Sequence, residues 1–443
     1  MKRAAYLLCA LAALLSGCSP GHVQATIGGG TGASVLINAG DAINDEVVVF
    51  QLPVTAATLD GNGNPSVLST PAQIEFVENA ASFLPLSLSN VPSGTYTGVT
   101  LTVATPTVVI VDPNTQVVTP LTVALTSTTV NVPFNPAVTV NGTALVANLD
   151  LDLANSIVIS GSSASVTPLF TATTTPVAPV GSQDDSNGEV DNIRGRASVV
   201  SGASFTIQPP NTGLPLTFLT DASTQFKDGI TSLAQVSAGM ILTVKAVSQP
   251  DGSLLARTVE SETETATGQA LEGVVTASTG APATSINLTT QSIIAANAAT
   301  APSPGNSVAV SITTATQFSV QSNTISGTLP AFDAATLGTG QQVVVDSETQ
   351  PGSSTSASAD KIKLQEQVLF GTVTGLSSGN FVLSVSTTSS FFSLTGAAAV
   401  PVQTSATTQL QNVTLADGAL VRVRGLLFFD GTSYSMIASR ITP

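Results

Sequence analysis

The chain has 443 residues and a formal net charge of −15, and only 9% of its residues are charged, against about 25% in ordinary soluble proteins. This length allows about three or four domains. The 12 Lys and Arg are outnumbered by 27 Asp and Glu, which argues against nucleic acid as a partner and against electrostatic attraction to anionic lipid. Thr and Ser take the place of the missing charges, and a composition rich in β-branched residues favours strands.

The first 18 residues have the pattern of an export signal. Lys2 and Arg3 form a positive segment, and residues 4–15 form an apolar run that is too short to anchor stably across a bilayer. Residues 15–18 (Leu-Ser-Gly-Cys) resemble the lipobox of bacterial lipoproteins, in which the cysteine thiol receives the lipid. The resemblance implies that Cys18 tethers the mature chain to the envelope.

The residue after this cysteine, Ser19, resembles the pattern of lipoproteins sent to the outer membrane, because it is not Asp. Cys9 would be removed with the signal and Cys18 would be acylated, so the mature chain would have no thiol for a disulfide, for Cys-His catalysis or for a zinc site. The one histidine, His22, lies in a Gly-rich spacer over residues 19–40, which argues against Ser-His-Asp catalysis.

Residues 41–181 have the pattern of a β-domain. Residues 96–103 alternate between apolar and polar positions, and so do residues 149–153. Asn141-Gly142 separates two short apolar runs, which predicts a β-hairpin at this point. Many short strands between Pro- and Gly-rich turns predict a β-sandwich of the immunoglobulin or prealbumin type.

This segment also resembles an uncharacterised β-sandwich domain of bacterial lipoproteins. The motifs that carry the resemblance are Gly40-Asp41-Ala42 before Val47-Val48-Val49, Val91-Pro92-Ser93-Gly94-Thr95-Tyr96, and Leu149-Asp150-Leu151-Asp152 before Ser156-Ile157. The chain departs from the family at Ile43, where Pro is usual, and at Leu151, where Phe is usual. That family has no established activity, so the resemblance implies a fold and no catalytic residue.

A polar, acidic linker is expected over residues 182–193, followed by three repeats at 194–264, 270–366 and 368–443. Four landmarks recur in the same order in each repeat. They are an opening glycine (Gly195, Gly273, Gly371), a Thr-Gln pair (Thr224, Thr316, Thr408), a glycine before an apolar strand (Gly239, Gly340, Gly418) and a closing alanine (Ala256, Ala359, Ala438).

Each repeat is long enough for five or six short strands, and closing them into a small β-barrel would remove exposed edges. The order of landmarks resembles an uncharacterised family of tandem small β-barrel domains of bacterial envelope proteins, most closely in residues 421–425 and 430–431. The second repeat departs most, with an insertion around residues 295–305. We expect each repeat to fold alone, and we expect Gly239, Gly340 and Gly418 to be structural turn residues with positive φ.

Carboxylates are the residues left for chemistry. Asp150 and Asp152 share one face of a predicted strand, where they could act as an acid–base pair or lie solvated on an outer face. Glu260, Glu262 and Glu264 also share a face if extended, but they follow the last strand of the first repeat and indicate a solvated linker.

Two segments have weak calcium-site character. Asp60, Asn62 and Asn64 have the alternate spacing of a calcium loop, without its Gly or its closing Glu, and are equally typical of a hairpin tip. The acidic linker could collect a cation through Asp184, Asp185, Glu189 and Asp191, or could simply be a solvated linker. No cofactor is otherwise implied.

These observations predict an all-β, lipid-anchored envelope protein without enzymatic activity. We expect it to act as a surface scaffold, an adhesion or a protein-binding module, with envelope or extracellular proteins as partners. The alternative is a periplasmic hydrolase that uses the carboxylates of Asp150 and Asp152.

Overall fold

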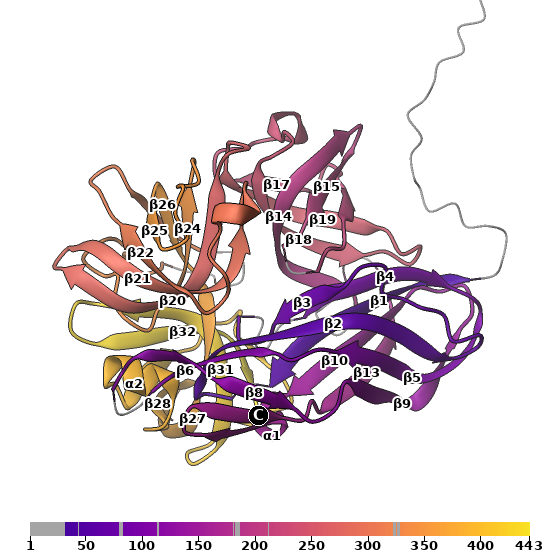
Figure 1. The fold of residues 1–443 in the computed structure, drawn as a ribbon, viewed down its shortest axis with the longest axis horizontal. Coiled ribbons are helices and arrows are strands. Elements are labelled where there is room, and N and C mark those ends of the chain that lie inside the picture. Colours follow the sequence, from indigo (N-terminus) through magenta and orange to yellow (C-terminus); the bar gives the residue numbers. More distant parts are fainter. Residues whose placement is uncertain are drawn as a thin grey trace, which may run out of the picture.

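The computed structural model describes residues 32–42, 44–78, 83–112, 115–179, 181, 187–210, 212–321, 325 and 328–443. The fold is all-β, with 58% strand and 4% helix. Four units follow one another along the chain and pack around a common centre (Figure 1). Cys18, His22, Asp184 and Asp185 lie outside the described residues.

The first unit, here called the N-terminal domain, spans residues 32–179. Its elements are β1 (Ala33–Ala42), β2 (Val47–Gly61), β3 (Ala72–Glu75), β4 (Leu84–Val91), β5 (Gly94–Val103), β6 (Thr107–Val111), β7 (Val118–Pro120), β8 (Thr122–Leu125), β9 (Thr129–Val140), β10 (Leu145–Asp152), α1 (Leu153–Ser156), β11 (Ile157–Ser160), β12 (Ser163–Val166) and β13 (Phe170–Pro176).

These strands form a sheet of order β13-β10-β1-β4, a sheet of order β7-β6-β2-β5-β9 with β3 on β2, and a small sheet of order β11-β12-β8. One apolar core joins them, to which β1 contributes Ile37, β2 contributes Phe50 and β10 contributes Leu149. Alternation decides which side chains face this core, as in β5, where Val99, Leu101 and Val103 are buried.

The predicted hairpin at Asn141-Gly142 is wrong. β9 pairs with β5, whereas β10 pairs in parallel with β1 and antiparallel with β13, so the two flanking strands belong to different sheets. Gly142 has a φ of 94°, and the turn therefore serves as a corner between sheets. A turn signal in the sequence shows where the chain reverses, but the partner of each strand is set by the core.

Repeat 1 begins earlier than the sequence suggests. Its elements are β14 (Glu189–Ser201), β15 (Ser204–Gln208), β16 (Leu216–Leu219), β17 (Gln225–Lys227), the 3₁₀ helix η1 (Leu233–Gln235), β18 (Ile241–Ser248) and β19 (Leu254–Thr263). Residues 189–193, which were assigned to the acidic linker, are part of β14 and pair with β18. The sheet closes through pairing of β16 with β19.

Repeat 3 has the same order. Its elements are β27 (Glu366–Ser377), β28 (Asn380–Val385), α2 (Ser390–Thr395), β29 (Ala399–Gln403), β30 (Gln409–Leu410), β31 (Leu420–Phe429) and β32 (Tyr434–Thr442), and it closes through pairing of β29 with β32. Repeats 1 and 3 thus form two closed five-stranded barrels in the described part of the chain.

Repeat 2 has this order with an interrupted last strand. Its elements are β20 (Gln269–Gly280), β21 (Ala283–Ile294), the 3₁₀ helix η2 (Ala298–Thr300), β22 (Ser307–Ser311), β23 (Gln317–Val320), β24 (Gln342–Ser347), β25 (Ser356–Ser358) and β26 (Lys361–Leu364). β25 pairs with β22 and β26 pairs with β24, so the two short strands occupy the place of β19 or β32. The predicted insertion contains η2.

The Thr-Gln landmark fixes each repeat in the same way. Thr224, Thr316 and Thr408 each donate a side-chain hydrogen bond of 2.7–2.8 Å to the carbonyl oxygen of the closing alanine of their repeat. Each hydroxyl also accepts a backbone N–H from the residue three positions earlier. The threonine therefore ties a turn to the last strand, which explains why the two landmarks occur together.

The glycine before the long strand has a backbone role. Gly239, Gly340 and Gly418 have φ values of 96°, 83° and 87°, a region that side chains disfavour. Each donates its N–H to a carbonyl of the repeat's first strand, at 2.7–2.8 Å. The opening position of each repeat requires glycine because the neighbouring strand lies too close for a side chain. At Gly371, for example, a Cβ would lie 2.4 Å from the carbonyl oxygen of Ser384.

Apolar cores and a backbone hydrogen bond join the units into a closed ring (Figure 1). Leu36 and Val146 of the N-terminal domain belong to the core of repeat 1, and Leu426 and Phe428 of repeat 3 belong to the core of repeat 2. Repeat 3 returns to the N-terminal domain, where the Ser390 N–H donates to the carbonyl oxygen of Asp45 at 2.7 Å. The repeats are consecutive in sequence but do not form an extended row.

Candidate functional site

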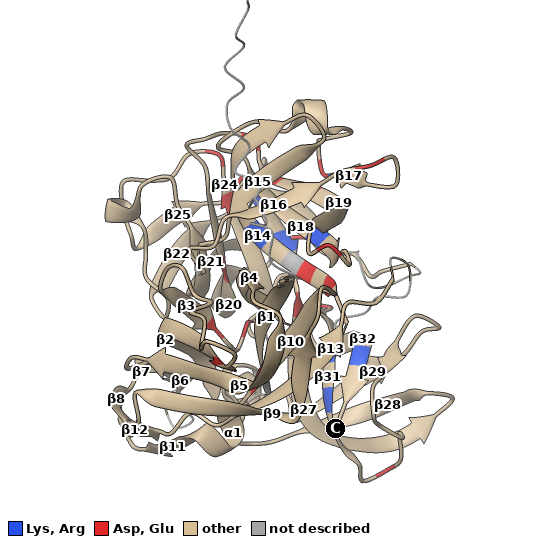
Figure 2. Cartoon of the chain, turned by 90° about the vertical axis from the view of Figure 1, so that its right-hand side faces the viewer, with Lys and Arg blue, Asp and Glu red and all other residues tan. Residues whose placement is uncertain are grey.

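Charged residues are few, and several of them lie close together on and beside β14 and β18 (Figure 2). Glu260 and Glu262 of β19 are both 4% exposed. The interpretation of these residues as a solvated linker is therefore wrong, because β19 continues through Thr263 and a lysine of repeat 2 reaches them. Glu264, beyond the end of the strand, is exposed.

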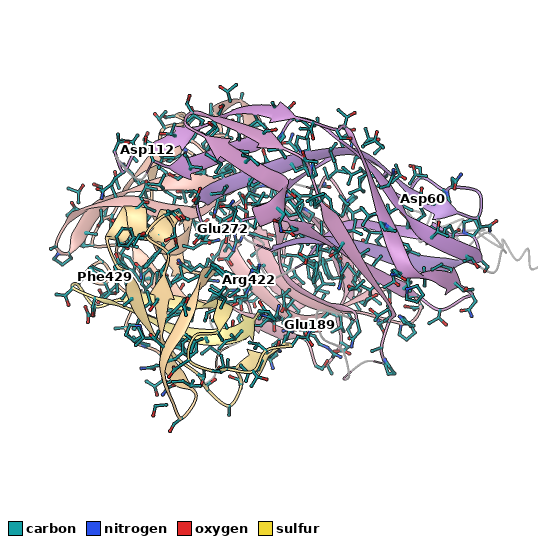
Figure 3. All side chains as sticks on the ribbon, turned by 90° about the horizontal axis from the view of Figure 1, so that it is seen from below. Asp60, Asp112, Glu189, Glu272, Arg422 and Phe429 are labelled. Carbon is teal, nitrogen blue, oxygen red and sulfur yellow. The ribbon has the colours of Figure 1, made fainter. Side chains whose placement is uncertain are left out.

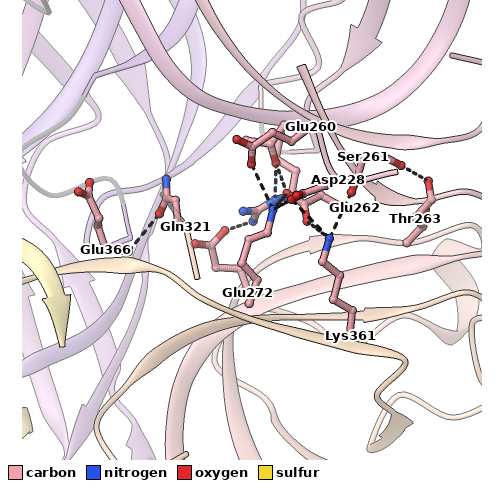
Figure 4. A network of polar contacts seen from close by, with 12 residues as sticks. Asp228, Glu260, Ser261, Glu262, Thr263, Glu272, Gln321, Lys361 and Glu366 are labelled. Carbon is pink, nitrogen blue, oxygen red and sulfur yellow. Dashed lines mark hydrogen bonds and ion pairs between the residues drawn. The ribbon is translucent and has the colours of Figure 1, made fainter. Parts of the chain in front are cut away.

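Lys363 of β26 lies at the centre of this cluster (Figure 4). Its Nζ is 2.7 Å from Asp228 Oδ2, 3.0 Å from Glu262 Oε1 and 3.2 Å from Glu260 Oε2, and the residue is 2% exposed. Burial alone would lower the pKa of Lys363, but these carboxylates raise it above its usual range. The lysine is therefore charged, and its three partners compensate that charge.

Lys361, two residues earlier on β26, extends the cluster. Its Nζ is 3.6 Å from Asp228 Oδ2 and donates to the carbonyl oxygen of Ser261 at 3.4 Å. Burial would raise the pKa of Glu262, but Lys363, Arg194 and Lys361 lower it to about 2. Glu262 is therefore an ionised carboxylate between two strands of different repeats.

Arg194 of β14 forms the second part. Its guanidinium makes an ion pair with Glu272 of β20, and its Nε donates to Thr243 Oγ1 at 3.4 Å. Thr243 in turn donates to Glu262 Oε1 at 2.7 Å, which connects the two parts. The connected residues, here called the ion network, are Arg194, Asp228, Glu260, Glu262, Glu272, Asp346, Lys361 and Lys363.

Carboxyl groups of the N-terminal domain face the same centre. Glu75 is fully buried and accepts backbone N–H groups from Phe50 at 2.8 Å and from Glu78 at 2.5 Å. Burial raises the pKa of Glu75 to about 8. Burial and the charge of Glu272 also raise the pKa of Glu78. Glu75 therefore keeps its proton near neutral pH, and Glu78 releases its proton less readily than a free glutamate does.

Of the predicted acid–base pair Asp150 and Asp152, Asp152 has a structural role. Asp152 caps α1, where its Oδ1 accepts the N–H of Asn155 at 3.2 Å and its Oδ2 accepts the Asn155 side chain at 2.7 Å. Asp150 is half-buried, and burial raises its pKa while Arg422 lowers it. A cavity between the N-terminal domain and repeat 3 lies nearby, lined by Asp45, Glu46 and Arg422 among others, but Asp150 and Asp152 do not line it.

The first calcium candidate is a hairpin loop. Asp60 accepts the Thr100 hydroxyl at 2.9 and 3.0 Å, Asn62 donates to the Ser93 carbonyl oxygen at 2.7 Å, and Asn64 Oδ1 accepts the Gly61 N–H at 2.9 Å. These side chains therefore hold the turn itself. Asp60 also lies at the far end of the N-terminal domain from Glu272 (Figure 3).

Of the second calcium candidate, only Glu189 and Asp191 lie within the described residues, and both belong to β14. Glu189 and Asp191 both pair with Lys245 of β18, whose Nζ lies 3.0 Å from Asp191 Oδ1. The lysine supplies the positive charge that a cation would otherwise bring. Within the described residues, no group of three or more His, Cys, Asp or Glu side chains has a metal-binding arrangement.

Comparison with known families supports the repeat assignment. Residues 194–260 and 370–442, which are repeats 1 and 3, match the model of a domain of unknown function (DUF5666). Among curated proteins, none matches the chain. The two matched segments are the two closed barrels, whereas repeat 2 carries the insertion and the split strand. In the described part of the chain, no helix has the length and apolarity needed to cross a membrane.

Proposed function

We propose that the protein is a non-enzymatic lipoprotein of the bacterial envelope that acts as a surface scaffold, an adhesion or a protein-binding module. The observation that carries this proposal is the closed ring of four β-units with shared cores, in which Leu36 and Phe428 each enter the core of a neighbouring unit. Shared cores limit movement between units, and a rigid surface loses little conformational entropy when it binds a partner.

The anchoring part of the proposal rests on the lipobox resemblance at residues 15–18. Cys18→Ala should leave the chain unlipidated and move it from the membrane fraction to the soluble fraction, or block its processing. Cys9→Ala is the matched control, because it removes the other thiol from within the apolar run and should fractionate like the parent. Membrane association of the Cys18→Ala variant equal to the parent's would contradict the anchor.

A binding role is tested by crosslinking on intact cells. The full chain should capture a small, reproducible set of envelope or extracellular proteins, and the soluble Cys18→Ala variant should recover the same set when it is added to envelopes. Capture that does not saturate with increasing protein would indicate non-specific adsorption and would contradict a binding module.

The alternative, a hydrolase that uses carboxylates, is favoured by one observation. Asp150 has a raised pKa through burial, and the nearby cavity is lined by Asp45, Glu46 and Arg422. If the protein were such an enzyme, Asp150→Asn would abolish a hydrolytic activity measured on envelope glycans or peptides. Under the proposed function, Asp150→Asn leaves partner capture unchanged.

A further inference from the structure

The junction between repeats 1 and 2 differs from the other apolar junctions of the ring. Its separate apolar cluster consists only of Ile241, Ala270, Ile294 and Val344. The neighbouring junction, between repeats 2 and 3, places Leu426 and Phe428 in the full core of repeat 2. Polar groups supply further contacts between repeats 1 and 2, through the ion network and through Glu348, whose carboxylate accepts the N–H groups of Glu264 and Thr265. This junction therefore depends more strongly on polar and charged groups.

Carboxyl groups at this junction outnumber the cations. The ion network contains five carboxyl groups and the three cations Arg194, Lys361 and Lys363. With the neighbouring Glu75 and Glu78, seven carboxyl groups lie in or beside the network. Asp228 is 34% exposed and can be screened by water, but the network carboxylates of β19, β20 and β24 are buried. Ionising every buried carboxyl would leave uncompensated negative charge in a low-dielectric interior.

Asp346 of β24 is the network carboxyl with the poorest compensation. It is 1% exposed, and neither carboxylate oxygen has a hydrogen-bond partner among the described residues. Glu262 of β19 faces it with a negative charge, and Glu262 Oε2 also has no hydrogen-bond partner in that part of the chain.

The cations that face Asp346 are already engaged. Arg194 of β14 is paired with Glu272, and Lys363 of β26 is shared by three carboxylates. Lys361, opposite Asp346 in the β24–β26 register, is directed to Asp228, Glu262 and the Ser261 carbonyl. On the other side β20 places Ala270 opposite Asp346, which brings no charge.

We propose that Asp346 makes the junction between repeats 1 and 2 a pH-sensitive switch, which is closed while this carboxyl holds its proton and loosens when the proton is released to solvent. Loss of the proton adds a second negative charge beside Glu262 and repels β19 of repeat 1 from β24 of repeat 2. Strands of repeat 3 lie outside the ion network and do not respond. This inference does not depend on the proposed function.

Burial and neighbouring charge set the direction of the response, because they favour the protonated form of Asp346. Burial and the charge of Glu262 raise the pKa of Asp346 well above its usual range. Glu75, which faces the same centre, has its pKa raised to about 8 by burial. The switch is therefore closed in mildly acidic surroundings and loosens as pH rises.

Amide hydrogen exchange of the full chain tests the proposal, after correction for the intrinsic pH dependence of exchange. Between about pH 6 and pH 9 the protection of β19 and β24 should fall by about tenfold or more, whereas β31 of repeat 3 should keep its protection. Asp346→Asn preserves the shape of the protonated acid and lets its amide donate to Glu262. In this variant the protection of β19 and β24 should change by less than about twofold over the same pH range.

Glu264→Gln is the matched control, because it removes an exposed carboxylate beside the same junction and should leave the parent's pH response intact. Asp346→Leu is a second uncharged variant that should behave like Asp346→Asn, and it covers the case in which the asparagine variant does not fold. Parent protection that stays constant from pH 6 to pH 9 would overturn the proposal. An undiminished pH response in a folded uncharged variant would also overturn it.

Discussion

At the scale of single residues, the ion network could not be predicted from the sequence. Lys363 lies 103 residues from Glu260 and 101 residues from Glu262, and no local pattern reports a contact over that separation. The one available signal was the alternation of Glu260 and Glu262 on one strand face, which is equally typical of a solvated edge. The partner decides between the two interpretations, and the fold supplies the partner.

Replacing Lys363, the central lysine, should show how much the ion network contributes to the free energy of unfolding. Lys363→Met leaves Glu260 and Glu262 buried without their main cation, and we expect the free energy of unfolding to fall by about 3–5 kcal/mol. Urea unfolding at neutral pH measures the loss. Arg257→Met, which removes one exposed hydrogen bond to Ser223, is the control and should change stability by no more than about 0.5 kcal/mol. Equal losses in both variants would contradict a network of this weight.

Glu75 and Glu262 give the stability of the fold opposite dependences on pH. Glu75 binds its proton more tightly in the folded state than in the unfolded state. Its contribution to the free energy of unfolding is therefore complete below its usual pKa of 4.5 and is lost as pH rises towards about 8. Glu262 has a pKa lowered to about 2, so its contribution is present above 4.5 and is lost as pH falls towards 2.

Urea midpoints should therefore be highest near pH 5 and fall towards pH 8. Glu75→Gln should flatten that alkaline decline, because the amide is neutral throughout. A decline of unchanged slope in this variant would show that Glu75 does not bind a proton over that range.

At the scale of elements, strands and repeats were predictable because they leave local signals. Alternation of apolar and polar residues located β5 and β10, and four landmarks located three repeats whose strand order is the same. The short helices were missed, since α2 has only 6 residues and its cues are a Ser389 cap and a left-handed Gly396. The start of β14 was missed because Glu189 and Asp191 look solvated until Lys245 is placed beside them.

The landmark glycines give a test at this scale. A Cβ at Gly418 would meet nothing within 4 Å, so substitution there strains only the backbone, at a φ of 87°. Gly418→Val should lower the free energy of unfolding of the full chain by about 1–3 kcal/mol. Gly352→Val is matched, because Gly352 has equal space without positive φ, and its effect should stay within about 0.5 kcal/mol in urea melts. Equal effects would remove the backbone explanation.

At the scale of the whole molecule, the closed ring changes what a single repeat can do alone. The repeated landmarks predict independent folding, but Leu426 and Phe428 of repeat 3 complete the core of repeat 2. A fragment of residues 366–443 would expose these side chains to water. The closure itself could not be predicted, because the sequence pattern of each repeat describes its own barrel and not the faces that meet its neighbours.

We therefore expect residues 269–443 to unfold in one cooperative thermal transition, measured by circular dichroism. Residues 366–443 should melt at a lower temperature and bind a hydrophobic dye. If the short fragment is as stable as the long one and binds no dye, the two cores are separate and the units of the ring are less strongly coupled than their contacts indicate.

One position, six residues after the landmark glycine, carries a different charged residue in each repeat, and its sign is reversed in repeat 2. It is Lys245 in repeat 1, Asp346 in repeat 2 and Arg424 in repeat 3. Lys245 pairs within its own repeat, Asp346 faces repeat 1, and Arg424 binds Glu366 at 2.9 Å. Three repeats of the same strand order on one chain can exchange strands while they fold. An exchange that involves repeat 2 would place a charge of the wrong sign at this position, so the charge difference helps the strands of repeat 2 to find their own repeat.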